Sequence, residues 1–137
     1  MREIVVDSSA IFAIILDEED GPVFRRVLGD ANPIISAATR VEIAQVALRR
    51  FGPAGISEAE GVLADYGVRT VPLDEDQSVA AISALIAYGI GRGTPPAVLN
   101  LGDSFSYALA RTRNLPLLYK GDDFSRTDIR SALASEE

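Results

Sequence analysis

Short apolar runs rich in β-branched residues alternate along this chain with longer segments of helical pattern. The apolar runs, typical of buried strands, are residues 2–7, 33–36, 68–73 and 115–120. The helical segments are residues 8–16, 22–28, 39–51, 57–66, 74–90 and 100–113. Right-handed crossovers through such helices make the strands parallel and cover both faces of the sheet. We therefore predict an α/β fold, a three-layer α/β/α sandwich with a central, mainly parallel sheet.

Two predicted helices carry apolar residues at helical spacing, so that each has an apolar stripe on one face. The stripe in the helix at 39–51 consists of Val41, Ala44, Leu48 and Phe51. The stripe in the helix at 74–90 consists of Val79, Ile82, Leu85 and Ile86. Gly52 and Pro53 are expected to end the first of these helices. Ser57 with Glu60 has capping-box spacing and predicts the next helix start, and Asn100 is predicted to cap the helix at 100–113.

Composition narrows the chemistry that the chain can perform. A length of 137 residues allows one domain, and the net charge of −7 is wrong for a protein that holds nucleic acid by bulk electrostatics. The absence of Cys and His excludes thiolate nucleophiles, zinc fingers and imidazole bases. No apolar run approaches the roughly 20 residues that span a membrane, and the N-terminus has no signal-peptide pattern. We expect a cytoplasmic protein that makes no use of a membrane.

Acidic residues follow the predicted strands, at the sheet edge where ligands bind in parallel α/β folds. Asp7 comes directly after the first strand, and Asp122 and Asp123 follow the last. Glu42 and Asp103 are expected in the first turns of helices that begin at the same edge. Four segments that are distant in sequence therefore each bring an acid to one place.

Each of these acids also has a purely structural interpretation. Asp7 would cap the helix that follows it, and Thr39 with Glu42 has capping-box spacing. Asp103 suits the positive end of a helix dipole, and Asp122 and Asp123 suit an ordinary turn.

Taken together, however, the acids point to a cation. Crowded carboxylates raise one another's pKa and weaken the fold unless a positive charge compensates them. Oxygen ligands without His or Cys favour Mg²⁺ or Mn²⁺. Such ions activate water and polarise phosphodiesters, so the pattern predicts a metal-dependent hydrolase.

Four segments resemble the PIN-domain ribonucleases, and among them the VapC-type toxins of type II toxin–antitoxin pairs. They are VVDSSAIFAIIL (5–16), the helix with Glu42, NLGDSFSYALA (100–110) and LPLLYKGDDFSRTDI (115–129). The resemblance implies a PIN domain over residues 1–130. An acidic tail follows at 131–137, and we expect its last residues, 135–137, to be frayed. The resemblance also implies a Mg²⁺-dependent endoribonuclease that cleaves structured RNA (tRNA or rRNA) with metal-activated water. Its implied partners are a second copy, in a homodimer, and a VapB-like antitoxin.

The same resemblance assigns roles to individual residues. Asp7, Glu42 and Asp103 match the family's acidic metal ligands, and Asp122 and Asp123 are both candidates for the fourth. The hydroxyl of Ser8 would orient Asp7. The segment at 92–98 is less basic than in relatives, and Ser104 replaces a frequent Cys. Our candidates for RNA contacts are Lys120, Arg49 and Arg92.

Two alternatives use the same features differently. A haloacid-dehalogenase-like phosphohydrolase would use Asp7, Lys120, Asp122 and Asp128, although Ser9 stands where such enzymes need a second Asp. A non-catalytic PIN-like module would keep the fold and use the acidic edge only to bind a protein.

Overall fold

Four parallel strands form one sheet in the computed structural model, which describes residues 1–95 and 98–133. The strands are β1 (Arg2–Val6), β2 (Ala31–Ser36), β3 (Arg69–Val71) and β4 (Leu117–Leu118), in the order β3-β2-β1-β4. At the centre of the register, Val5 lies opposite Ile34 on one side and Leu117 on the other. The predicted parallel sheet is confirmed, although β3 and β4 are shorter than the apolar runs suggested.

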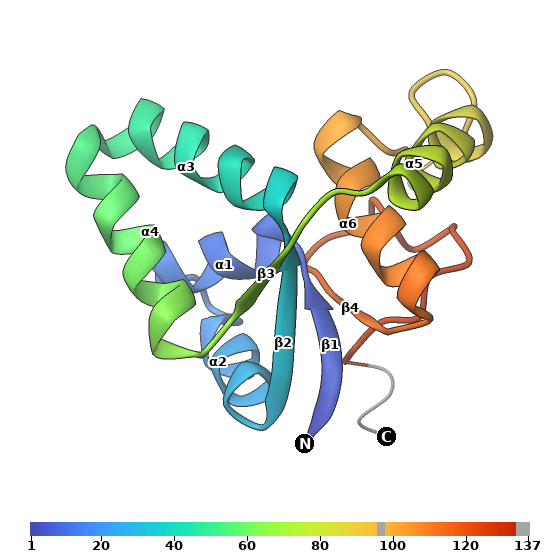
Figure 1. Ribbon diagram of the computed structural model, residues 1–137. Coiled ribbons are helices and arrows are strands. Elements are labelled where there is room, and N and C mark those ends of the chain that lie inside the picture. Colours follow the sequence, from blue (N-terminus) through green and yellow to red (C-terminus); the bar gives the residue numbers. More distant parts are fainter. Residues whose placement is uncertain (96–97, 134–137) are drawn as a thin grey trace.

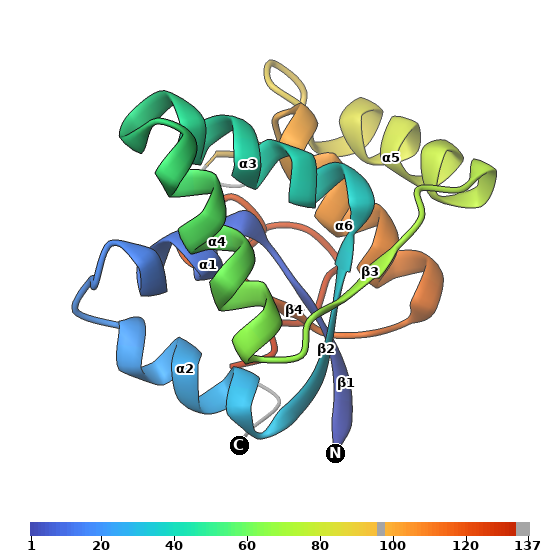
Figure 2. The same ribbon diagram turned by 60° about the vertical axis from the view of Figure 1, so that its left-hand side comes forward.

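Helices cover both faces of this sheet (Figures 1 and 2). One apolar core joins Ile4, Val6 and Ile35 to α1 (Ser8–Ile15), α2 (Gly21–Gly29), α3 (Ala37–Phe51) and α4 (Pro53–Asp65). The second joins Val5, Ile34 and Leu117 to α5 (Glu75–Tyr88) and α6 (Leu101–Arg113). Neighbouring strand residues point to opposite faces, so successive apolar residues supply both cores. The three-layer α/β/α sandwich is therefore confirmed.

Two of the predicted helix starts are wrong. Ser36 caps α3, its hydroxyl accepting from the Ala38 amide at 3.2 Å, so the helix begins at Ala37. Glu42 therefore lies in the second turn and not in a capping box with Thr39. The next helix, α4, begins at Pro53, because Gly52 takes a φ of 75° and proline suits a first helical position. The predicted capping box at Ser57 is absent, and Glu60 instead pairs with Arg40 at 2.9 Å.

The predicted N-terminal cap of α6 is confirmed. The Asn100 side chain accepts a hydrogen bond from the Asp103 amide at 2.8 Å, and the Asp103 carboxylate accepts one from the Asn100 amide at 3.0 Å. This reciprocal pair fixes Asp103 in the first turn of the helix. The helix ends at Asn114, which adopts the left-handed conformation with a φ of 53°.

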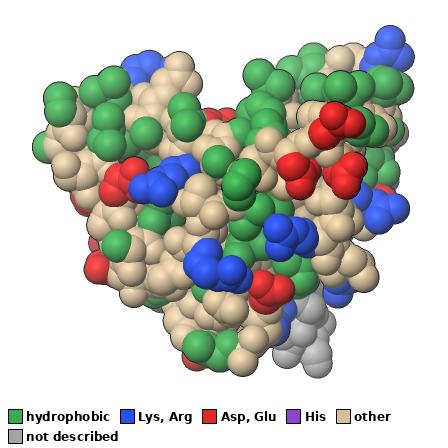
Figure 3. All heavy atoms as spheres, viewed as in Figure 1, with side chains coloured by type: hydrophobic (Ala, Val, Ile, Leu, Met, Phe, Trp, Pro, Cys, Tyr) green, Lys and Arg blue, Asp and Glu red, His purple; other side chains and the backbone are tan. Residues whose placement is uncertain are grey.

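The apolar stripes of α3 and α5 do not face a core. Val41 is 69% exposed and Ile82 is 59% exposed, and Leu48, Phe51, Val79 and Ile86 are exposed as well. The residues that α3 buries are Thr39, Ile43 and Ala47. Figure 3 shows hydrophobic side chains on both shoulders of a notch between the two halves of the molecule.

The first part of the predicted tail packs on the domain. Ser131 forms a parallel bridge with Leu117, and Ala132 is fully buried. Residues 134–137, on which the predicted fraying falls, lie outside the described residues. Within the described ranges, no helix combines the length and the apolar character that crossing a membrane requires.

Candidate functional site

Asp7 stands at the carboxyl end of the central strand β1 and is almost completely buried, with 2% of its surface exposed. One carboxylate oxygen accepts hydrogen bonds from the amide and the hydroxyl of Ser9, at 3.1 and 2.7 Å, and thereby caps α1. The other oxygen accepts from the Ser106 hydroxyl at 2.6 Å. Asp7 is thus a helix cap and at the same time a buried charge held in a fixed orientation.

The hydroxyl that contacts Asp7 from α6 belongs to a short buried chain. Ser106 gives its only hydroxyl proton to Asp7, so Thr39 donates to the Ser106 oxygen across 3.3 Å. Ser8 was predicted to orient Asp7, and the structure corrects this: Ser9 and Ser106 make the hydrogen bonds to Asp7, whereas the Ser8 hydroxyl acts on Glu42. Ser106 was not assigned a role from the sequence, although it lies one turn after Asp103.

Asp103 enters the same region from the first turn of α6 and is 9% exposed. Burial raises the pKa of its carboxyl to about 7, and the negative charges of Asp7, Asp123 and Glu42 act in the same direction. The hydrogen bond from the Asn100 amide opposes the shift. These four acids therefore lie close enough for their charges to repel.

Glu42 comes from the second turn of α3. Burial and the charge of Asp7 raise the pKa of its carboxyl, and the Ser8 hydroxyl partly offsets this. Its Oε1 atom is buried and has no hydrogen-bond partner among the described residues. A buried carboxylate oxygen without a partner is unfavourable in the chain alone, so this atom is suited to accept from an added group.

The two candidates for the fourth acid differ in what they face. The negative charge of Asp123 raises the pKa of Asp103, whereas the charge of Asp122 acts on Tyr119. Both side chains are exposed. Asp123 is therefore the acid that the turn after β4 brings toward Asp103.

The donor set of this acidic cluster, formed by Asp7, Glu42, Asp103 and Asp123, fits a hard divalent cation. It consists of carboxylate oxygens only, among them the unpartnered Glu42 oxygen. The carboxyls of Glu42 and Asp103 have raised pKa values. Mg²⁺ and Mn²⁺ prefer such ligands. In the described part of the chain, no group of three or more His, Cys, Asp or Glu side chains is placed so that it could hold a metal ion as it stands.

Comparison with known proteins assigns the family. The PIN domain family matches residues 4–130. Ribonuclease VapC42 of Mycobacterium tuberculosis is 43% identical over 129 residues, which cover 93% of this chain and 98% of the relative. The chain belongs to the VapC ribonucleases of the PIN-domain family. Ribonuclease VapC of Mycolicibacterium smegmatis is 42% identical over 91% of this VapC-family chain and 96% of its own length.

Solved structures show the same fold. VapC20 of M. tuberculosis, described as a Sarcin-Ricin loop cleaving toxin, has a TM-score of 0.73 at 18% identity and covers 92% of this chain and 95% of its own. The structure of DNA-bound VapBC from Salmonella typhimurium has a TM-score of 0.71 at 21% identity. The match covers 96% of this chain and 97% of the solved chain.

The basic residues proposed from the sequence lie around the cluster, not in it. Lys120 pairs with Glu18 at 2.9 Å and with Asp20 at 3.0 Å, both in the connection between α1 and α2. The role of Lys120 in RNA contact stays a prediction, and in this structure its ammonium is paired within the chain. Arg49 is exposed in the last turn of α3, about 10 Å along the helix from Glu42. Arg92 is exposed in the turn after α5.

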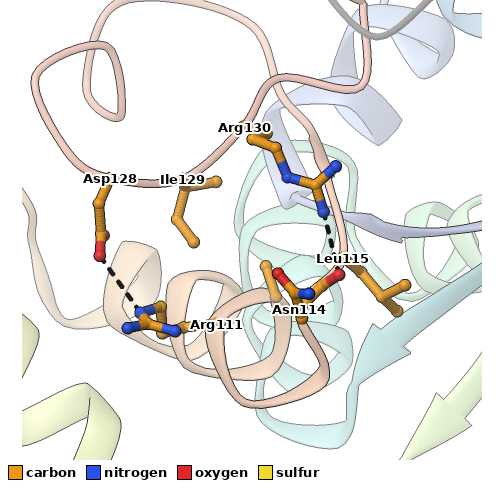
Figure 4. Close-up of a pocket in the computed structure, with 7 residues that line it drawn as sticks. Arg111, Asn114, Leu115, Asp128, Ile129 and Arg130 are labelled. Atoms are coloured by element: carbon orange, nitrogen blue, oxygen red, sulfur yellow. Dashed lines mark hydrogen bonds and ion pairs between the residues drawn. The ribbon is translucent and has the colours of Figure 1, made fainter.

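Two hollows lie on the described surface of this VapC-family chain. One, of about 310 Å³, lies between α3 and α6 and is lined by Ala38, Val41, Glu42, Gln45, Leu101, Gly102 and Phe105. The other, of about 240 Å³, lies at the far end of α6, where Asp128 pairs with Arg111 at 3.2 Å (Figure 4). Asp128 also accepts from the Tyr107 hydroxyl at 2.6 Å. The phosphohydrolase alternative would use Asp128 together with Asp7, whereas in this structure Asp128 is held by Arg111 and Tyr107 at the second hollow.

Proposed function

We propose that this chain is a divalent-metal-dependent endoribonuclease and the toxin of a VapBC-type pair. The observation that carries the proposal is the acidic cluster, in which buried carboxyls with raised pKa values meet at one edge of the sheet. Its family membership gives the activity class. The substrate we propose is structured RNA, namely tRNA or rRNA.

Asp7, Glu42, Asp103 and Asp123 would hold the ion, which we propose to be Mg²⁺ or Mn²⁺. When bound, such an ion supplies a Lewis acid for the phosphodiester and a water of lowered pKa. The chain's own residues prepare the site beforehand. Ser9 and Ser106 fix the Asp7 carboxylate, and the capping box with Asn100 fixes Asp103. Glu42 offers its buried, unpartnered oxygen for the ion or for a proton of the water.

RNA has to reach this site against a net charge of −7. Local contacts, not a general positive potential, must therefore hold the phosphates. Arg49, in the last turn of α3, and Arg92, in the turn after α5, are exposed and are proposed for this role. Local contacts favour a folded RNA with few cleavage sites over indiscriminate degradation.

The exposed apolar stripes support protein partners. Large apolar side chains on α3 and α5 rarely stay in water when they form a continuous surface. We propose that a second copy covers this surface in a homodimer, and that a VapB-like antitoxin restrains the nuclease in the cytoplasm. A solved structure with the same fold is described as DNA-bound VapBC from S. typhimurium.

The test is cleavage of purified tRNA and rRNA by the isolated chain. We expect discrete fragments with Mg²⁺ or Mn²⁺, none with EDTA, and none from Asp7→Asn purified in parallel, which controls for contaminating nucleases. Activity that survives EDTA would contradict the metal-dependent scheme. Binding of a partner without cleavage under any ion would instead favour the non-catalytic module.

A further inference from the structure

A glycine in the first turn of α6 lies directly against the carboxyl group of Glu42. If Gly102 carried a Cβ atom, the three heavy atoms nearest to it outside its own helix would all belong to Glu42. They are Oε2, with which the Cβ would collide, Cδ at 2.6 Å and Oε1 at 3.0 Å. The Glu42 side chain therefore occupies the space that any other residue at this position would fill.

The backbone conformation does not explain this glycine. Gly102 is a regular residue of α6 and is not among the glycines with positive φ. Glycine is one of the poorest helix formers, so alanine would suit the helix better. What the position requires is the absence of a side chain, because α3 and α6 meet here and the Glu42 carboxyl lies between them.

We propose that Gly102 is a positioning residue for Glu42: it leaves open the space through which the Glu42 carboxylate reaches Asp7 and Asp103. The inference rests on the proposed function, in which Glu42 helps to hold the ion. The colliding atoms are the far end of a flexible side chain, so rotation of Glu42 relieves the contact without moving either helix. A side chain at 102 would thus remove a ligand from the cluster while the fold stays intact.

The decisive variant is Gly102→Ala. We expect it to fold and to melt at or above the temperature of the wild-type chain, because alanine favours the helix and a displaced Glu42 no longer repels Asp7. We expect kcat/KM for RNA cleavage to fall by about 10- to 100-fold, the loss typical when support for a metal ligand is removed. Gly61→Ala is the matched control: this glycine is exposed in α4, and a Cβ atom added there would meet nothing within 4 Å. It should keep full activity.

A double-mutant cycle separates positioning from general damage. If Gly102 acts through Glu42, then adding Gly102→Ala to Glu42→Ala costs no further activity. An equal loss in both backgrounds would overturn the proposal. If Gly102→Ala fails to fold, the double variant Glu42→Ala/Gly102→Ala should still fold, because the Glu42 carboxyl that would collide is gone. If the double variant also fails to fold, the proposal is overturned.

Crystal structures of the wild-type chain and of Gly102→Ala give a readout that does not depend on catalysis. We expect the Glu42 carboxyl to point away from Asp7 and Asp103 in the variant only. An unchanged Glu42 in the variant would refute the positioning role. A wild-type chain that cleaves no RNA with any ion would refute the proposed function, and the two structures would still decide where Gly102 holds Glu42.

Discussion

The acidic cluster and the outer faces of α3 and α5 invert the usual distribution of polar and apolar residues. At the sheet edge, Asp7 is 2% exposed and Asp103 is 9% exposed. On the outer helices, Ile82 and Val41 are more than half exposed. Folding normally does the opposite, because buried charge is expensive and buried apolar surface is favourable.

The two regions would be stabilised by different kinds of partner. Buried carboxylates that repel one another are relieved by a cation, whereas an exposed apolar stripe is relieved by another protein surface. A cation site involves a ligand of one or a few atoms, whereas a protein interface involves many residues. The two regions should therefore respond to different substitutions.

The largest effect is expected from Asp103→Asn. The change keeps an oxygen that accepts from the Asn100 amide but removes the negative charge, so cleavage should fall by about 10³-fold or more. The melting temperature should hold or rise, because a repelling buried charge is gone. Glu58→Gln, an exposed acid of α4, is the control that removes one charge elsewhere. Full activity of Asp103→Asn in a fluorogenic RNA assay would contradict the assignment.

A charge placed in the apolar stripe tests the second region. Ile82→Asp should weaken self-association by roughly 100-fold, since an unpaired charge in an interface costs about 3 kcal/mol. Light scattering over a concentration series measures this change. Ser57→Asp, at an exposed position on α4 and outside both stripes, should leave the association unchanged. A wild-type chain that is monomeric at all concentrations would show that no second copy covers this face.

The buried hydroxyl beside Asp7 should matter less than the carboxylates. Ser106→Ala removes the 2.6 Å hydrogen bond to Asp7, and we expect a loss of about 10-fold in kcat/KM. Ser104→Ala is the matched control, because this buried hydroxyl of α6 donates to the Leu101 carbonyl and not to an acid. Equal losses in the two variants would mean that Ser106 contributes only to packing.

A smaller effect is expected in the pH dependence of stability. The pKa of Asp103 lies at about 7 in the folded chain, above its ordinary value of 3.8, so the folded state binds more protons between these values. Stability without metal should therefore fall as the pH rises through this window. The chain has no His, so few other side chains ordinarily titrate between pH 5 and 8. Melting curves of Asp103→Asn should show a flatter pH dependence; parallel curves would contradict the shift.

The sequence predicted the fold and most of the acidic cluster, because these depend on local patterns. Strand runs and cap residues are local, and they placed Asp7 and Asp103 at the same sheet edge. Glu42 was placed there as well, although the helix start was set two residues late because Ser36 was not recognised as its cap.

The failures concern contacts between distant elements. The periodicity of Ile82 and Val79 identifies one face of a helix but not what covers that face. Ser106 contacts Asp7, which is 99 residues away in sequence, and Gly102 lies against Glu42 of α3, and no local pattern signals such contacts. The ion pair of Lys120 with Glu18, across the fold, is another contact that no local pattern signals.

Thermal melting with and without Mn²⁺ tests most directly whether the buried acids form a cation site. A ligand at 100 times its dissociation constant stabilises the folded chain by about 2.7 kcal/mol, a shift of several degrees for a chain of this size. We expect this rise for the wild-type chain at neutral pH and its loss in Asp103→Asn. An identical melting temperature of the wild-type chain at every Mn²⁺ and Mg²⁺ concentration would contradict the cation site.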